Sequence, residues 1–468
     1  MARPRVLRWL EIALVWFLLT AGLAVRYHTT QSWRFAGSDT YGYLKVAEEL
    51  RLHHRYALGP EPEPLAWVRP PLFSLFILVA KGDLRADIHG GEGWIRLKLV
   101  QIWLEVLGTG LLTYFLARRF AGVLGGGLAL ALVMFWPPTV LGAGSILTEC
   151  LGTLLYTAAI APLVLGEARP RRWFAVAGAM VALSTLLRPD GLLLAAAFVP
   201  AVLWLRGERP WRRRIVVGLV AALAFTFVFA PWPIRNYLRF QELRPVGGRI
   251  DRYQRPVLHY EGFWEWLRSW APDWQPMTWP TTCYYDLGCR PWIELYDGPG
   301  AFDSPAERSA VNQLLLRRIR EGHSPAVSAG FLQLAEAKRR RHPIAYHLTL
   351  PLSRAYHMWV APFDELLQGV PPWPAATAIV RRYMEPASGV LFFSALAGSV
   401  ILLGSRRTRR GATVLVVAVG VRTAVMAYTF YCMPRYAVEQ LPIVFVLVAA
   451  GAVEGGRLLH HRLRRRQR

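Results

Sequence analysis

Acidic and basic side chains occur at several points of an otherwise apolar chain of 468 residues, and the basic ones stand within two residues of a proline. The acids are Asp39 in GSDTYGYLKVAEEL and Glu149 in LTECLGTLLY, and the arginines are Arg69 in VRPPLFSLF, Arg188 in LLRPDGLL, Arg235 in APWPIRNYLRF and Arg435 in CMPRYAVEQLP. A guanidinium group binds two phosphate oxygens at once and stays charged at any relevant pH. A carboxylate within reach of a hydroxyl group can take its proton. Together, such residues could hold a lipid phosphate and activate a hydroxyl that attacks the carbon bound to it.

Each of these residues also has a simpler structural interpretation. Asp39 could cap the amphipathic helix that follows it, and Glu149 could be an acid that stabilises a helix N-terminus. Arginines at the ends of apolar segments can extend to the headgroup region, and Arg188 could pair with Asp190 across a tight turn. Arg422 falls two turns inside an apolar segment, where a charge is costly and usually functional, but the sequence names no partner for it.

The apolar residues that position these side chains form long blocks. Hydrophobic residues make up 54% of the chain, and the blocks are about 17–22 residues long, enough to cross a ~30 Å hydrocarbon core. Such blocks must be helices, because lipid offers no partner for a free backbone N–H or C=O group. We predict an all-α polytopic membrane protein with spans near 9–25, 97–117, 122–140, 148–166, 173–187, 190–205, 215–232, 387–404, 411–430 and 437–455.

The net charge of +24 is distributed in a way that orients these spans. Arginines cluster at block ends, in 3–8, 118–119, 169–172, 212–214, 406–410 and 462–468. This is the positive-inside pattern of a membrane protein rather than the basic face of a nucleic-acid binder, so we predict no nucleic-acid partner. The N-terminal block is interpreted as an uncleaved span. The segments 26–94, 137–148, 188–190, 233–386 and 431–436 then lie outside, and all six residues above share that side.

The segment 343–362 is apolar enough to cross, yet His347, Arg354 and His357 fall on one helical face. Crossing would bury these groups and change the parity of the last three spans, so we predict a helix lying at the outer interface. If the segment does cross, a further partial span must lie in 366–386. The expected bundle therefore has about 10–12 transmembrane helices with large outer loops.

Three parts follow from this topology: a seven-span module 1–232 with a first outer loop 26–94, a Trp-rich outer region 233–386, and C-terminal spans with a basic tail in 387–468. Long loops over a rigid scaffold are where chemistry is expected. Cys283 and Cys289 lie in the outer region and could form a disulfide or stay free. No CxxC motif or Cys/His cluster indicates zinc, and we predict no metal site.

The order of these segments resembles the GT-C superfamily of membrane glycosyltransferases, within its protein O-mannosyltransferase and lipid A aminoarabinose transferase branch. SDTYGYLKVAEEL resembles the first-outer-loop motif with an acid, and VRPPLFSLF is similar to the Lys/Arg-Pro-Pro-Leu element. LTECLGTLLY looks like the acid that opens the fourth span. PWPIRNY and PRYAVEQLP resemble the Pro-Trp-x-x-Arg-Asn-Tyr and Arg-Tyr-x-x-x-x-x-Pro segments. The resemblance covers nearly the whole chain.

The resemblance implies a polyprenyl-monophosphate-sugar donor, inversion at the anomeric carbon, and an acceptor that arrives at the outer face of the inner membrane. The acceptor could be a protein, a glycolipid or a polysaccharide. Asp39 would be the base or the acid that orients the acceptor, and Arg69 and Arg235 would bind the phosphate. The family often has an adjacent pair of acids in the first loop, whereas Thr40 follows Asp39 here. A divalent cation is conceivable but not indicated.

Two other classes of function are compatible with these residues. A transporter or flippase of lipid-linked sugars would bind the same headgroup, but it would be expected to carry inverted repeats and broken midplane helices, which the sequence does not show. A non-catalytic membrane subunit would keep the fold without turnover. Substitution of Asp39 separates these classes, since an enzyme would lose turnover and keep its affinity for the donor.

Overall fold

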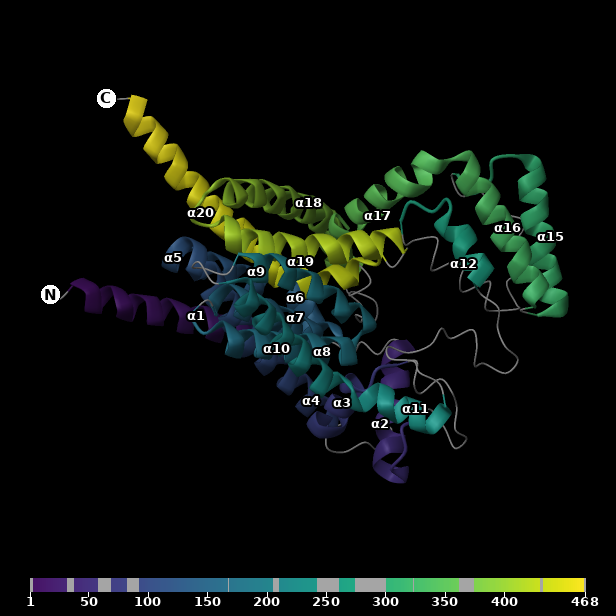
Figure 1. Cartoon of the computed structure of the whole chain (residues 1–468), viewed down its shortest axis with the longest axis horizontal. Helices are drawn as coiled ribbons and strands as arrows, with labels where there is room; N and C mark the ends of the chain where they lie inside the picture. The colour runs from purple at the N-terminus through teal and green to yellow at the C-terminus, as the bar shows by residue number, and fades with distance from the viewer. Residues whose placement is uncertain are drawn as a thin grey trace.

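The computed structural model describes residues 3–31, 38–57, 69–81, 92–166, 168–204, 210–241, 261–273, 300–322, 324–361, 374–429 and 432–466. Within these ranges the regular structure is entirely helical, with no strand (Figure 1). Several of the helices are long and apolar enough to cross a membrane. The predicted class, an all-α polytopic membrane protein, is confirmed.

The first spans form a helical hairpin beside a long N-terminal helix, α1 (Arg3–Gln31). The hairpin comprises α4 (Glu92–Trp103), the π-helix η2 (Leu104–Thr109) and α5 (Gly110–Phe135). Gly122 has φ 72°, and a Cβ atom on Gly126 would lie 3.1 Å from the carbonyl oxygen of Tyr114. In a straight helix these two residues would be ~18 Å apart, so the chain reverses at Gly122, where only glycine adopts this φ without strain. The predicted spans 97–117 and 122–140 are the two arms.

The next helices are joined by sharp bends. They are α6 (Pro137–Gly144), α7 (Glu149–Leu165), α8 (Pro170–Leu187), the 3₁₀-helix η3 (Pro189–Ala197) with α9 (Phe198–Leu203), α10 (Trp211–Phe229) and α11 (Pro231–Phe240). The axis turns by 120° between α6 and α7 and by 42° between α10 and α11. A Cβ atom on Gly178 would lie 2.2 Å from the carbonyl oxygen of Ala221, so glycine lets α8 and α10 pack backbone to backbone, as small residues do in membranes.

The C-terminal helices complete the bundle. They are α18 (Pro374–Gly404), α19 (Arg409–Tyr428), the 3₁₀-helix η7 (Pro434–Gln440) and α20 (Leu441–Arg466). A Cβ atom on Gly451 of α20 would lie 2.3 Å from the Cα atom of Gly398 in α18. The predicted spans 387–404 and 437–455 fall within these helices, and residues 411–428 of the predicted span 411–430 lie in α19.

Five described stretches pass as membrane spans by length and composition, or up to seven if each bent pair counts as one span. One of the five is Trp94–Phe135, which counts once although it reverses at Gly122. The predicted total of 10–12 crossings stays a prediction.

The remaining helices gather at one end of the bundle (Figure 1). They are α2 (Ser38–His53), α3 (Leu72–Lys81), α12 (Glu261–Arg268), α15 (Pro305–Glu321), α16 (Pro325–Arg341) and α17 (Leu350–Trp359), which follows the π-helix η5 (Ala345–Thr349). The N- and C-terminal ends lie at the opposite end. At that end Arg457 donates to the carbonyl oxygen of Ala121, and Arg118 pairs with Glu11 at 2.7 Å. The described helices of the predicted outer segments and the two chain ends predicted to be cytoplasmic thus lie at opposite ends of the molecule.

Within the segment 343–362, residues 343–359 are helical, and α17 packs against α19. Arg354 is 1% exposed and points inward, where its Nε atom donates to the carbonyl oxygen of Ala271 at 2.9 Å and its Nη2 atom to that of Arg268 at 2.6 Å. His347 is exposed and lies 3.1 Å from the hydroxyl of Tyr428. The three polar groups therefore do not share one exposed face, because Arg354 caps the end of α12. The interfacial location stays a prediction.

One apolar core joins the three predicted parts of the chain. It contains Leu18 of α1, Trp266 of α12 and Phe445 of α20. The parts 1–232, 233–386 and 387–468 therefore share a core where they are described. Cys150 and Cys432 are both buried.

Candidate functional site

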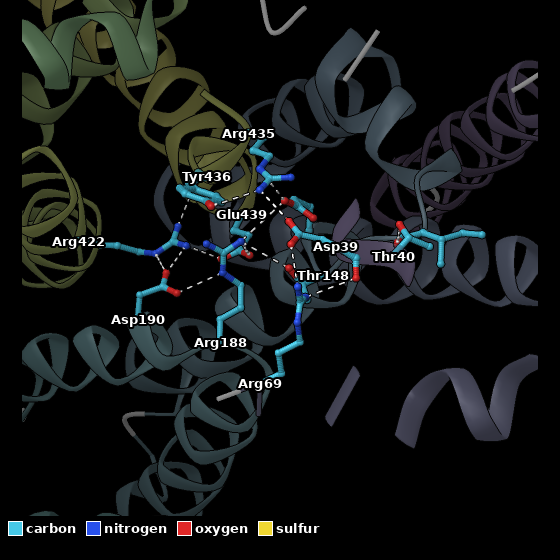
Figure 2. Close-up of polar contacts among 12 residues, drawn as sticks. Asp39, Thr40, Arg69, Thr148, Arg188, Asp190, Arg422, Arg435, Tyr436 and Glu439 are labelled. Atoms are coloured by element: carbon cyan, nitrogen blue, oxygen red, sulfur yellow. Dashed lines mark hydrogen bonds and ion pairs between the residues drawn. The ribbon is translucent and has the colours of Figure 1, made fainter. Parts of the chain in front are cut away.

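Four arginines and four acids lie close together where α2, α7, α8, η3, α19 and η7 meet, and Figure 2 labels all of them except Glu149. Beside them is a cavity of about 450 Å³. Its charged lining residues are Asp39, Arg69, Glu149, Arg188, Asp190 and Arg435. Arg422 and Glu439 stand behind this lining, bonded to Asp190 or to each other. The structure thus brings together five of the six residues that the motifs singled out.

Asp39 stands in the first turn of α2, between two arginines. Its Oδ1 atom accepts from Nη2 of Arg69 at 3.1 Å and its Oδ2 atom from Nη2 of Arg435 at 3.0 Å. Burial would raise the pKa of Asp39, but the charges of Arg435 and Arg69 outweigh burial and hold the pKa below its ordinary value. Thr40 anchors the turn by donating to the carbonyl oxygen of Ile146 at 2.8 Å. Asp39 is therefore held as a carboxylate by ion pairs.

Arg69 is positioned by the prolines that follow it. Pro70 and Pro71 keep the chain out of a helix until α3 begins at Leu72. The guanidinium group lies 4.7 Å from the ring centroid of Tyr43. A Cβ atom on Gly42 would lie 3.1 Å from it, so a glycine in α2 leaves room for the arginine.

A second, more deeply buried cluster adjoins the first. Nε of Arg188 donates to Oδ1 of Asp190 at 3.1 Å, as predicted for the turn, while Oδ2 of Asp190 accepts from Nε of Arg422 at 2.9 Å. Nη2 of Arg422 also bonds to Oε2 of Glu439. A buried charge is tolerated only when it is paired and hydrogen-bonded. The partners that the sequence could not name for Arg422 are therefore Asp190 and Glu439.

Glu149 begins α7 and is 2% exposed. Its Oε1 atom lies 3.7 Å from Nη1 of Arg188 and 3.9 Å from Nε of Arg435. Within the described part of the chain, its Oε2 atom has no hydrogen-bond partner. Glu149 thus lines the cavity, and this Oε2 atom is buried.

Three side chains of the site were not singled out from the sequence. Tyr436 lies against Arg188 with its ring centroid 4.1 Å from the guanidinium carbon, and Tyr43 holds Arg69. Glu439 pairs with Arg422 inside the bundle. Tyr436 and Glu439 belong to the same PRYAVEQLP segment as Arg435. An acid within an apolar span is itself a functional signal, and it could have identified Glu439.

Arg235 is not brought to the cavity. It lies in α11, where Nη1 donates to Oδ1 of Asn236 at 3.0 Å and Nη2 to the carbonyl oxygen of Tyr56 at 3.3 Å. Its guanidinium group lies 5.3 Å from the ring centroid of Trp232. The hydroxyl of Tyr56 in turn donates to the carbonyl oxygen of Arg69 at 2.9 Å. Arg235 therefore supports the segment that carries Arg69, and direct phosphate binding by Arg235 stays a prediction.

Two further predictions concern a disulfide and a metal site. Cys283 and Cys289 lie outside the described residues. Among the residues that are described, no group of three or more His, Cys, Asp and Glu side chains is arranged to hold a metal ion.

An apolar groove of about 690 Å³ adjoins the polar cavity. It lies among α17, α18, α19 and α20, and its walls include Leu352, Phe392, Val416, Gly420 and Leu447. Val425 and Thr429, near the end of α19, line both the groove and the polar cavity. A ligand with a charged head and a long apolar chain fits this pair of spaces.

No family model matches this sequence, and no curated protein matches it. Among solved structures, the chain is similar to the archaeal oligosaccharyltransferase AglB from Archaeoglobus fulgidus in complex with an inhibitory peptide and a dolichol-phosphate. The identity is 13% and the TM-score 0.51, over 98% of this chain and 52% of AglB. The Archaeoglobus fulgidus oligosaccharyltransferase tethered with an acceptor peptide gives 14% identity and a TM-score of 0.50, over 94% of this chain and 49% of that chain. ArnT from Cupriavidus metallidurans gives 13% and 0.40, over 95% and 78%.

The chain spans about half the length of AglB, and at this identity the likeness concerns the fold alone. AglB is a membrane glycosyltransferase of the superfamily that the sequence motifs resemble. The chain therefore shares its fold with the half of AglB that it covers.

Proposed function

We propose that this protein is an inverting glycosyltransferase that moves a sugar from a polyprenyl-monophosphate donor to a hydroxyl acceptor at the outer face of the cell membrane. The observation that carries the proposal is Asp39 between Arg69 and Arg435, in a cavity that meets an apolar groove. One space offers cations and carboxylates, and the other offers room for an isoprenoid chain. An amphipathic donor with a phosphate at its polar end needs both.

The donor would lie with its chain along α19 and its phosphate against Arg69, Arg188 and Arg435. These guanidinium groups offer planar pairs of N–H donors that match phosphate oxygens. Tyr43 and Tyr436 hold Arg69 and Arg435 from the side. The similar oligosaccharyltransferase structures support a lipid-phosphate donor and an acceptor by analogy, since one is a complex with a dolichol-phosphate and another is tethered with an acceptor peptide.

The reaction needs one base and a stabilised leaving group. Asp39 would take the proton of the acceptor hydroxyl while the hydroxyl oxygen forms a bond to the anomeric carbon. The bond between that carbon and the phosphate oxygen breaks, and the phosphate gains one negative charge. The arginines stabilise this charge, so no second acid is needed. Attack opposite the leaving phosphate inverts the anomeric carbon. Glu149, which also lines the cavity, would bind a sugar hydroxyl or replace Asp39 as the base.

The proposed acceptor is a protein, a glycolipid or a polysaccharide, the three classes that the sequence analysis names. The decisive experiment uses purified protein in liposomes with a polyprenyl-phosphate sugar and a membrane extract as a source of acceptor. A transferase releases polyprenyl phosphate and labels an acceptor, whereas a flippase moves the intact donor to the other leaflet. Movement of intact donor without release of polyprenyl phosphate would contradict the proposal.

A further inference from the structure

The proposed base and the proposed phosphate clamp are bonded to each other. Arg69 and Arg435 each direct an Nη2 atom at a different oxygen of Asp39. We propose that these two arginines keep Asp39 from accepting a proton until the donor arrives, and that the donor phosphate releases Asp39 by taking both guanidinium groups. This inference rests on the proposed function, since it requires the phosphate to bind at these arginines.

The charge balance of the site indicates why the exchange falls on Asp39. Four arginines face four acids, so a phosphodiester brings a fifth anion to a balanced network. One carboxylate must then lose part of its cationic surroundings. The side chain of Asp39 is 38% exposed, against 20% for Asp190, 6% for Glu439 and 2% for Glu149. Asp39 is thus the acid that water and an acceptor hydroxyl can reach.

The other charged groups around Asp39 cannot replace the two arginines. Arg188, from the end of α8, is bonded to Asp190 at 3.1 Å and to Oγ1 of Thr148 at 3.4 Å. Glu149, from α7, is a like charge that would favour protonation of a released Asp39. Tyr43, from the same helix as Asp39, and Tyr436, from η7, stack on the arginines. Once the phosphate holds the guanidinium groups, Asp39 faces a carboxylate and the acceptor.

The exchange links donor binding to proton uptake. In the free protein the arginines hold the pKa of Asp39 below its ordinary value, and with donor bound the pKa would be higher. Protonation of Asp39 then strengthens donor binding. This gain in affinity is complete below the pKa of Asp39 in the free protein and is lost as the pH rises through its pKa in the complex. Donor affinity should therefore fall as the pH rises between these values, by up to about tenfold per pH unit.

The test uses methyl geranyl phosphate, a phosphodiester whose single charge does not change over the relevant pH range. Calorimetry in buffers of different ionisation enthalpy should show that wild-type protein takes up a fraction of a proton, at most about one, on binding it. Asp39→Asn should bind the probe at least as tightly and take up no proton at this site, because the competing carboxylate is gone. In turnover assays, the acid limb of kcat should lie at higher pH than that of kcat/KM for the donor, since kcat reports the complex.

Asp303→Asn is the matched control. Asp303 is also held by two cations, Lys338 at 3.0 Å and Arg341 at 3.0 Å, and lies 3.0 Å from His342, but it precedes α15 and does not line the cavity. This variant should keep the proton uptake of the wild type. Equal, pH-independent probe binding by wild type and Asp39→Asn would overturn the exchange while the phosphate clamp stands. No binding of the probe by either protein would overturn the clamp, and the exchange with it.

Discussion

Replacing Asp39 by asparagine keeps the size of the side chain and its ability to accept a hydrogen bond, but it removes the basic oxygen. Loss of a general base typically lowers the rate by about 10²–10⁴. We expect Asp39→Asn to insert, fold and bind donor, and to transfer sugar slower by that factor in a release assay. Asparagine caps helices as well as aspartate, so a role in capping forecasts normal activity. A near-normal transfer rate would make Glu149 the first candidate for the base.

Removing either arginine that contacts Asp39 should weaken the binding of the donor. Arg69→Ala and Arg435→Ala should each cost roughly 1.5–3 kcal/mol if a charged hydrogen bond to phosphate is lost. Lysine should restore only part of the affinity, because it lacks the planar two-point contact. Arg235→Ala is the comparison: the geometry places Arg235 off the cavity, so its effect on a donor-binding isotherm should be smaller. An equal loss in Arg235→Ala would favour direct phosphate binding by that residue.

At this scale the sequence predicts residue types better than their partners. The motifs identify Asp39, Arg69, Glu149, Arg188 and Arg435, and the structure gathers all five. Short motifs contain no information on which distant acid meets which arginine. The pairing of Arg422 with Glu439 joins α19 to η7, and that with Asp190 joins it to η3. Only the packing of these elements makes those pairs.

At the scale of helices, the groove along α19 gives a prediction about the donor's chain. Gly420 lines the groove, and a Cβ atom there would have nothing within 4 Å. Gly420→Phe should therefore fill the groove without disturbing the packing. Displacing two or three carbons from an apolar wall costs ~0.8 kcal/mol each, so affinity for a long-chain donor should fall on the order of tenfold to a hundredfold, with a geranyl donor less affected.

Gly218→Phe in α10 is the control for this substitution, because a Cβ atom on Gly218 also has nothing within 4 Å and this residue is not among those lining the groove. Affinities for the two donors would be measured in the same nanodiscs. Equal losses for long and short chains in Gly420→Phe would contradict the path of the chain. Equal losses in Gly218→Phe would point to a general effect of a bulky residue on the bundle.

The positions of the helices were predictable where hydropathy alone determines them. The points where helices bend or change geometry were less predictable. Apolar blocks near 173–187 and 411–430 correspond to α8 and α19. The reversal at Gly122 lies between two predicted spans, where the basic pair 118–119 already indicated a turn. The 3₁₀ geometry of Pro189–Ala197 was not foreseen. Asp190 in its first turn is bonded to Arg188 two residues away and to Arg422 of α19, and the second of these contacts is tertiary.

At the scale of the whole molecule, the last prediction concerns topology. The positive-inside pattern places 169–172 and 406–410 in the cytoplasm and 233–386 outside. The structure agrees in geometry, since the helices α12, α15 and α16 stand at the end opposite the two termini (Figure 1). A reporter fused after Arg172 or Arg410 should therefore read cytoplasmic, and one fused after Arg320 in α15 should read external.

The proposed function depends on this topology, because the proposed donor reaches Asp39 and Arg435 from the end of the molecule that carries α15. Fusions after Arg119 provide an internal check, since the turn at Gly122 must share the side of Arg172. An external signal at Arg172 together with a cytoplasmic one at Arg320 would show that the molecule has the opposite orientation in the membrane. The cavity would then face the cytoplasm, where nucleotide sugars rather than lipid-linked sugars are the common donors, and the lipid-linked donor would lose its main support.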